Sequence, residues 1–193
     1  MSTWIVPQPK TLAIALGANL PSAYGSPTST LIAARGLLEK IVCEWIKSSL
    51  KENTNLNEIS TGINWRWSPL FETEPLGGPT NQPKFINAAV LINGSAMESI
   101  DPSEQAILNL LEKTLMIENA LGRERKNDSS TWGPRTIDID LLAWGDLQVK
   151  TQKLILPHPR IFERSFVLTP LAAALTIKSK APKKLAPQKG WSE

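Results

Sequence analysis

Short apolar runs and helical periods alternate along the chain. The segment 11–19, TLAIALGAN, is an apolar run that ends at Gly17 and Asn19, which is typical of a buried strand entering a loop. After a stretch rich in Pro, Ser and Gly (21–27), apolar residues recur at intervals of three and four, the spacing of an amphipathic helix. These residues are Leu31, Ala34, Leu38, Ile41, Val42 and Trp45. The pattern therefore predicts a strand followed by a helix.

The middle of the chain predicts two paired strands. The polar segment 51–62 has no period, so we expect a long surface loop there. Segments 63–73 and 84–94 are strand-like and flank a linker rich in Gly and Pro (75–83). This arrangement suggests an antiparallel pair of strands.

The second half of the chain predicts one long helix and further strands. The tetrapeptide 101–104, DPSE, predicts a helix start in which the aspartate is the cap and the proline takes the first helical position. The helix should end at Gly122. Apolar and polar residues alternate over 136–144, as in a half-buried strand. A short strand near 154–156 and a helical segment from 166 to 175 follow.

The order β-α-β-β-α-β with extra C-terminal strand and helix elements is that of a ferredoxin-like α+β sandwich, in which helices cover one face of the sheet. We expect one domain over residues 11–175, with a polar insertion at 46–62. The tail 178–193 is basic, and we expect it to be flexible.

Composition and charge narrow the class of protein. The chain has 193 residues, 41% of them apolar, and a single cysteine, Cys43, which excludes an intramolecular disulfide. No apolar run approaches the roughly 18 residues of a membrane helix, so we expect a cytoplasmic monomer without a membrane partner. The net charge is only +3, and five lysines lie between Lys178 and Lys189. A solvated end explains them better than a nucleic-acid arm, so we expect no nucleic-acid partner.

Two aspartates, Asp138 and Asp140, stand two residues apart in a predicted strand, so their side chains share one face, with about 7 Å between their Cα atoms. Magnesium is typically bound by one or two carboxylates together with substrate phosphates. The alternative is a strand whose outward face carries two solvated acids. Four cationic residues just before the pair favour magnesium, because cations there could neutralise phosphate charge during phosphoryl transfer. They are Arg123, Arg125, Lys126 and Arg135.

Other nucleotide and hydrolase motifs are absent from the sequence. No GxxxxGK[ST] run exists, which excludes a P-loop, and no GxGxxG follows a strand. The single histidine, His158, lies between two prolines and could donate to a phosphate or have a structural role. One histidine without a GxSxG motif also disfavours a Ser-His-Asp hydrolase. The residues therefore indicate magnesium-dependent transfer of a phosphoryl-type group from ATP to a small substrate.

Four blocks of the sequence carry a more specific signal. They are ALGAN (15–19), ETEPLGGPTNQPKFINAAV (72–90), WGPRTIDIDLL (132–142) and LPHPRIFERSFVLTPL (156–171). In this order they resemble the 6-hydroxymethyl-7,8-dihydropterin pyrophosphokinase family of folate synthesis, over about residues 11–175. The resemblance implies a ferredoxin-like fold and transfer of pyrophosphate from ATP to the pterin hydroxymethyl oxygen, with two magnesium ions and release of AMP.

The resemblance also implies a role for each matched residue. Asp138 and Asp140 would hold both metal ions, and Arg123 and Arg135 would contact the phosphates and assist the transfer. The implied ATP contacts are Glu118, Arg125, Trp132, Leu141, Lys153, His158 and Arg164. The implied pterin contacts are Thr73, Pro75, Leu76, Phe85, Asn87 and Phe166. Stacking between two aromatic rings and pairing with an amide suit a flat heteroaromatic ring.

Some positions depart from the family pattern, and two rival functions stay open. Thr131 stands where the family commonly has a basic residue, and Lys126 could supply that charge. A different magnesium-dependent kinase for another heterocycle is the first rival. A non-enzymatic RNA-binding module is the second, because a ferredoxin-like sheet with aromatics can stack bases. The second rival gives no reason for two aspartates on a face that would meet phosphates.

Overall fold

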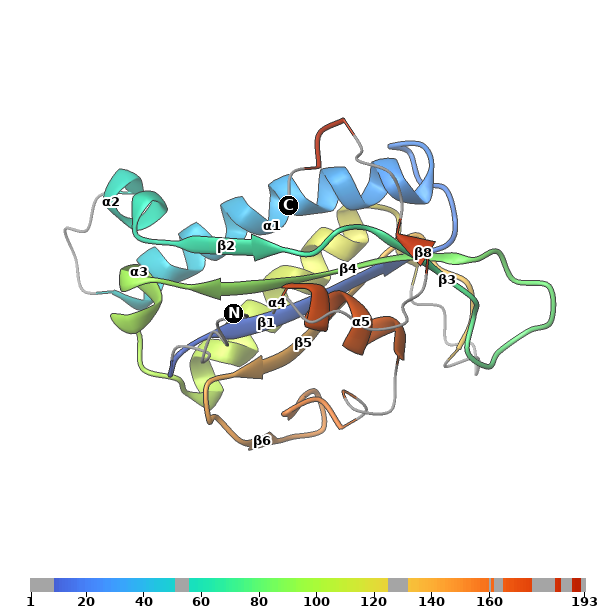
Figure 1. Ribbon diagram of the computed structural model, residues 1–193. Coiled ribbons are helices and arrows are strands. Elements are labelled where there is room, and N and C mark those ends of the chain that lie inside the picture. Colours follow the sequence, from blue (N-terminus) through green and yellow to red (C-terminus); the bar gives the residue numbers. More distant parts are fainter. Residues whose placement is uncertain are drawn as a thin grey trace, which may run out of the picture.

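The structure of the protein is a computed structural model that describes residues 9–50, 56–124, 132–159, 161, 165–174, 183–184 and 189–191. Within this part of the chain, strands β1 to β5 and β8 form one sheet, and β6 and β7 form a separate two-stranded sheet. Helices pack on both faces of the larger sheet (Figure 1).

The central strand is β1 (Leu12–Ala18), which pairs antiparallel with β4 (Phe85–Asn93) on one side and with β5 (Asp138–Trp144) on the other. All its residues are buried, because side chains pack against both faces of the sheet. The register sets Gly17 opposite Asn87 of β4 and opposite Asp138 of β5. β4 and β5 therefore bring Asn87 and Asp138 to the same end of the sheet, on either side of Gly17.

The edge of the sheet is a broken strand where the sequence predicts a continuous one over 63–73. β2 (Asn64–Trp67) and β3 (Phe71–Thr73) both pair antiparallel with β4, as expected. Trp67 faces Val90 and Phe71 faces Asn87, so the edge strand holds one more residue than β4 over this stretch. The extra residue is a bulge, a position that tolerates Pro69, which has no N–H to donate.

One face of the sheet is covered by α1 (Pro27–Ser49) and α4 (Glu104–Ala120), which pack against each other. Ser26 caps α1 by accepting a hydrogen bond from Ser29 N, and Pro27 opens the helix, where a missing N–H costs nothing. Between helices and sheet, the fully buried Trp45 donates to the Ala106 carbonyl at 2.9 Å. The ring of Trp45 also meets Trp144 edge-on.

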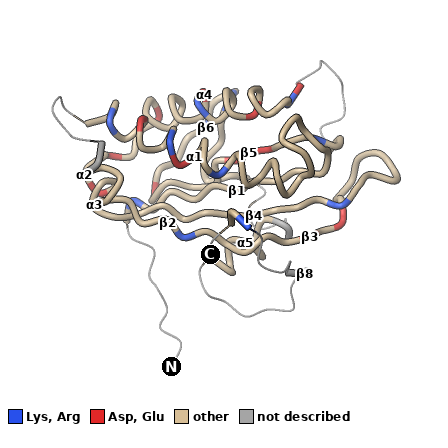
Figure 2. Tube along the Cα trace, turned by 90° about the horizontal axis from the view of Figure 1, so that it is seen from above, with Lys and Arg blue, Asp and Glu red and all other residues tan. Residues whose placement is uncertain are grey.

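The opposite face carries α5 (Ser165–Ala174), seen on the other side of the sheet from α1 and α4 in Figure 2. Val167 and Ala174 of this helix form a second apolar cluster with Ala13 and Ala15 of β1 and with Leu142. Helix α5 covers only part of this face, so the end of the sheet that carries Gly17 lies beside a cleft.

The remaining elements include two departures from the sequence predictions. Residues 56–61 form a short helix, α2 (Leu56–Thr61), inside the predicted surface loop, and α3 (Ser95–Glu98) follows β4. The predicted cap at Asp101 is wrong. Ser103 caps α4 instead, because its hydroxyl accepts from Ala106 N, while Asp101 pairs with Lys10 at 2.8 Å. The Lys10 ammonium lowers the pKa of the exposed Asp101 carboxyl by hydrogen bonding to it.

The strand order β5-β1-β4 followed by β2 and β3, with α1 and α4 on one face, is the ferredoxin-like α+β arrangement that the sequence predicts. The additional elements are the hairpin of β6 (Val149–Lys150) and β7 (Ile155–Leu156), helix α5, and β8 (Lys183–Lys184). No helix in the described ranges has the length and apolar character needed to cross a membrane.

Candidate active site

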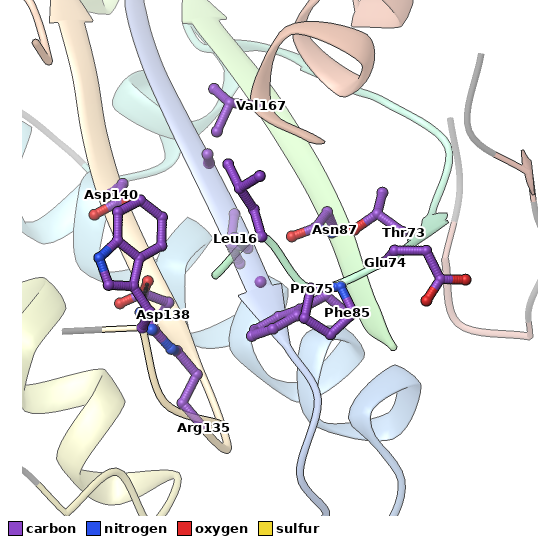
Figure 3. Close-up of a pocket in the computed structure, with 14 residues that line it drawn as sticks. Leu16, Thr73, Glu74, Pro75, Phe85, Asn87, Arg135, Asp138, Asp140 and Val167 are labelled. Carbon is purple, nitrogen blue, oxygen red and sulfur yellow. Dashed lines mark hydrogen bonds and ion pairs between the residues drawn. The ribbon is translucent and has the colours of Figure 1, made fainter. Parts of the chain in front are cut away.

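A cleft lies where β1, β4 and β5 meet (Figure 3). It encloses about 660 Å³, including open space at its mouth. Many of the residues singled out in the sequence line it together: Thr73, Pro75, Leu76, Phe85, Asn87, Trp132, Arg135, Asp138 and Asp140. Ala15, Leu16, Gly17, Glu74 and Val167 complete the lining.

Asp138 is held between two arginines. Arg123 Nη1 donates to its Oδ1 at 3.0 Å, and Arg135 Nη1 donates to its Oδ2 at 2.6 Å. Arg123 also donates to the carbonyl of Ile137, and all three charged side chains are largely shielded from solvent. The two guanidinium groups outnumber the carboxylate that they hold, and the Asp140 carboxylate beside them makes the four side chains formally neutral together. Each guanidinium group is nevertheless of the kind that binds phosphate oxygens.

Asp140 is the second carboxylate of the pair, one strand repeat beyond Asp138. It lines both this cleft and a second one described below. Within the described residues, no group of three or more His, Cys, Asp or Glu side chains forms a complete protein metal cage. The donor set of two carboxylates in a cleft nevertheless fits a magnesium ion that takes its other ligands from phosphates and water.

Glu118 lies behind the aspartates. This residue of α4 is 1% exposed, and its Oε1 accepts a hydrogen bond from Ile139 N at 2.7 Å. Ile139 is the residue between the two aspartates, so Glu118 fixes the backbone that carries them. Arg123 N donates to the Glu118 carbonyl at 2.9 Å, which ties the end of the same helix to an arginine of the site.

The other wall of the cleft offers an amide and an aromatic ring. Asn87 is 5% exposed, and its Nδ2 donates to Thr73 Oγ1 at 2.8 Å, so its orientation is set by the neighbouring strand. A Cβ atom added at Gly17 would stand 2.7 Å from Asn87 Oδ1, so only glycine leaves this amide in place. The Arg135 guanidinium carbon lies 5.9 Å from the centroid of the Phe85 ring, which joins the amide side of the cleft to the charged side.

The segment 74–84 closes against the chain around Trp132. Gln82 Nε2 donates to the carbonyls of Trp132 and Gly77, at 3.0 and 3.1 Å. Gly78 has φ +76°, and a Cβ there would lie 2.2 Å from the Trp132 carbonyl oxygen. Nearby, Lys84 pairs with Glu74 at 2.8 Å, and this hydrogen bond raises the pKa of the exposed Lys84 ammonium.

The buried Asn19 joins the end of β1 to two other segments of the chain. Its Oδ1 accepts from Arg135 N at 2.7 Å, and its Nδ2 donates to the Pro83 carbonyl at 3.0 Å. The backbone N–H groups of Asn19 and Leu20 both donate to the Arg135 carbonyl. The sequence marks Asn19 as a loop signal and as part of the block 15–19, but it does not indicate these bonds or the role of Gln82, because they reach across 64, 116 and 50 positions of the chain.

A second cleft lies on the far side of β5, between α4 and the β6–β7 hairpin. Leu141, Lys153 and His158, three of the residues expected to contact ATP, line it together with Asp140. His158 is held in place by its backbone N–H, which donates to the Leu142 carbonyl at 2.8 Å. The two clefts therefore share a carboxylate.

Some predicted site residues lie outside the part of the chain that the structure describes. Arg125 and Arg164, as well as Lys126 and Thr131, are outside the described residues. Phe166 belongs to α5, but its side chain is not described. Their predicted roles stay predictions.

The class of protein follows from this arrangement. A ferredoxin-like sheet carries paired aspartates with their arginines beside two clefts that share Asp140, which is a small-molecule site of the kind that a phosphoryl-transferring enzyme uses. The model of the family "7,8-dihydro-6-hydroxymethylpterin-pyrophosphokinase (HPPK)" matches residues 13–176. The chain belongs to this family.

Individual relatives agree with this assignment. A 2-amino-4-hydroxy-6-hydroxymethyldihydropteridine pyrophosphokinase of Haemophilus influenzae is 32% identical over 161 residues, which cover 83% of this chain and 79% of the relative. The Bacillus subtilis protein of the same name is 46% identical over 105 residues, 54% of this chain and 55% of that protein. A folate synthesis bifunctional protein of Arabidopsis thaliana is 43% identical over 110 residues, 57% of this chain but 20% of the relative. The chain thus spans about half or less of several of its relatives.

Proposed function

We propose that the protein transfers the terminal diphosphate of ATP to the hydroxymethyl group of 6-hydroxymethyl-7,8-dihydropterin and releases AMP. The observation that carries the proposal is the place of Asp140, which lines both a cleft suited to a flat ring and the cleft between α4 and the β6–β7 hairpin. A reaction between two bound substrates needs their reacting atoms to meet within a few ångströms. Asp140 stands where the two clefts join, and Asp138 lines the first cleft.

The pterin would occupy the first cleft. Its edge alternates hydrogen-bond donors and acceptors, and the Asn87 amide, held by Thr73, can match one of each. Phe85 would stack on one face of the ring, with Phe166 expected on the other face. Thr73, Pro75 and Leu76 line the same cleft, and their backbone groups would meet the edge of the ring. The hydroxymethyl group would then point toward the aspartates.

ATP would occupy the second cleft, with Leu141, Lys153 and His158 beside the nucleotide. Arg125, Trp132 and Arg164 are the other expected nucleotide contacts. Glu118, which does not line either cleft, would contribute by holding the strand between the aspartates. Trp132 lines the first cleft and not the second, so the expected nucleotide contacts lie on both sides of Asp140.

The carboxylates of Asp138 and Asp140 would hold two magnesium ions, which screen phosphate charge on both sides of an in-line displacement when bound. Arg123 and Arg135 both contact Asp138. The two guanidinium groups would contact the transferred phosphates and offset their charge. The arginines would stabilise charge, and the aspartates would hold the metal.

The test is turnover with Mg-ATP and 6-hydroxymethyl-7,8-dihydropterin, with the nucleotide product resolved by chromatography. AMP is the expected product, and ADP would favour a kinase for a heterocycle instead. Asp138→Asn and Asp140→Asn should each abolish turnover, whereas Asp146→Asn, which changes an exposed aspartate just after the same strand, should leave it unchanged. Near-normal turnover of both site variants would contradict the metal role. The cytoplasmic location and the monomeric state stay predictions.

A further inference from the structure

Strand β8, in the C-terminal part of the chain, lies against β3, the strand that carries Thr73 at the wall of the first cleft. β8 pairs antiparallel with the outer edge of β3, with Lys184 opposite Phe71 and Lys183 opposite Glu72. The family model matches only residues 13–176, so this pairing is made by a part of the chain beyond the matched region. β3 continues into Thr73 and then into Glu74, Pro75 and Leu76 of the cleft.

Besides β8, strand β3 contacts helix α5 and pairs with a single other strand, β4. It has three residues and pairs with β4 over the same three positions. A short strand held from one side only is marginal, and a further strand on its free edge adds backbone hydrogen bonds and covers exposed N–H and C=O groups. The pairing with β8 therefore stabilises the strand that orients Asn87 through Thr73.

Trp191 anchors the same segment to the protein. The residue is 7% exposed, and its Nε1 donates to the Ser68 carbonyl at 3.0 Å. Its ring meets Trp67 edge-on at 5.0 Å between centroids, and the Arg35 guanidinium lies 5.1 Å from its centroid. Arg35 is in turn fixed by Glu39 at 3.0 Å. Trp191 thus belongs to the main core although it lies near the end of the chain.

The site of this anchor is the bulge between β2 and β3. Ser68, which accepts the Trp191 N–H, is fully buried and exchanges two hydrogen bonds with Ala89 of β4, one through its backbone N–H and one through its hydroxyl. Bulges re-aim the strand that follows them. The Trp191 indole, which is hydrogen-bonded to this bulge, therefore helps to set the direction of β3.

We propose that β8 and Trp191 form an intramolecular brace in which Trp191 is a positioning residue for pterin binding. The proposal rests on the proposed function for its kinetic consequence. Loss of the anchor frees β8, loosens β3 and leaves Thr73 and Asn87 correctly placed in only a fraction of the molecules. The KM for the pterin then rises by the inverse of that fraction, while the ATP cleft beyond β5 is unaffected.

The experiment compares the full chain with Trp191→Ala and Gly190→Ala. Gly190 has φ +87°, and an added Cβ would lie 3.2 Å from Ile32, so alanine strains the approach to the anchor without removing the indole. Lys189→Ala changes an exposed residue of the same segment and is the matched control. If the competent fraction falls to between a third and a tenth, the pterin KM rises about three- to tenfold with Trp191→Ala, and less with Gly190→Ala. The ATP KM and kcat should stay within about twofold.

Amide hydrogen exchange provides a readout that does not depend on activity. In the full chain the amides of 71–73 should be protected, and Trp191→Ala should speed their exchange while leaving β1 unchanged. An inactive full chain would refute the proposed function but would leave this measurement valid. Unchanged exchange over 71–73 in Trp191→Ala, or an unchanged pterin KM in an active variant, would overturn the brace. If Trp191→Ala fails to fold, Gly190→Ala and hydrogen exchange in the unaltered chain remain as tests. Unprotected amides at 183–184 in the unaltered chain would also overturn the brace.

Discussion

Gly17 offers a sharp test of the wall of the first cleft that carries Asn87, because its substitution should weaken the binding of the pterin and not of ATP. In Gly17→Ala the new methyl group would lie 2.7 Å from Asn87 Oδ1, closer than real Cβ atoms approach any neighbour. The amide must therefore move by some tenths of an ångström. It cannot do so freely, since Asn87 is 5% exposed and donates to Thr73 at 2.8 Å.

The magnitude follows from the cost of that displacement. Adding a methyl group to a filled site costs about 1–3 kcal/mol. If this cost falls on the amide that binds the pterin, the dissociation constant rises by roughly 5- to 150-fold. The nucleotide cleft contains neither Gly17 nor Asn87, so ATP affinity should stay within about twofold.

Isothermal titration calorimetry with the pterin and, separately, with Mg-ATP measures both affinities. Gly36→Ala is the matched control, because Gly36 lies in α1 and a Cβ there meets nothing within 4 Å. That variant should bind both ligands normally and be more stable by up to about 1 kcal/mol, the helix preference for alanine over glycine. Gly17→Ala protein that is folded and binds the pterin as tightly as the unaltered chain would refute this account of the wall.

Three further predictions concern the scaffold and the metal. Glu118→Ala should lower the free energy of unfolding by about 1–3 kcal/mol and should also lower kcat, because the Ile139 N–H loses its buried acceptor. Glu118→Gln should restore most of the stability and most of the kcat. Chemical unfolding and initial rates measure the two quantities, and an alanine variant with normal kcat would contradict the positioning role. Trp45→Phe should destabilise the protein by about 1–3 kcal/mol without changing the pterin KM, because the fully buried side chain loses its hydrogen bond to the Ala106 carbonyl and part of its volume, and neither residue lines the first cleft; a changed pterin KM would contradict this separation. Chelation with EDTA should abolish turnover and added Mg²⁺ should restore it, with an unchanged melting temperature, because Asp138 keeps both arginine partners without metal; turnover in EDTA would count against the metal site.

Local patterns predicted the elements of the fold and the acidic pair. The apolar run 11–19, the helical period from Leu31 to Trp45 and the alternation over 136–144 each depend on residues close in sequence, and each corresponds to an observed element, β1, α1 and β5. The spacing of Asp138 and Asp140 likewise determines that they share a strand face. What these patterns specify is local geometry.

Interactions between distant segments could not be predicted in this way. The bulge at Ser68 depends on the register with β4, and the cap at Ser103 competes with an ion pair between Asp101 and Lys10. Trp191 packs against Trp67 across most of the chain, so no local signal distinguishes it from a residue of a solvated tail. The bonds of Gln82 are of the same kind. Such contacts are determined by tertiary packing. The family resemblance predicts cleft residues only within its four matched blocks.

The central claim is that a diphosphate group is transferred as a unit to the pterin. Mass spectrometry of the pterin product, after incubation with Mg-ATP and 6-hydroxymethyl-7,8-dihydropterin, measures this directly. The account predicts a product heavier by two phosphoryl groups, formed in equal amount with AMP and absent when Asp140→Asn replaces the unaltered chain. A product carrying one phosphoryl group, formed together with ADP, would contradict it.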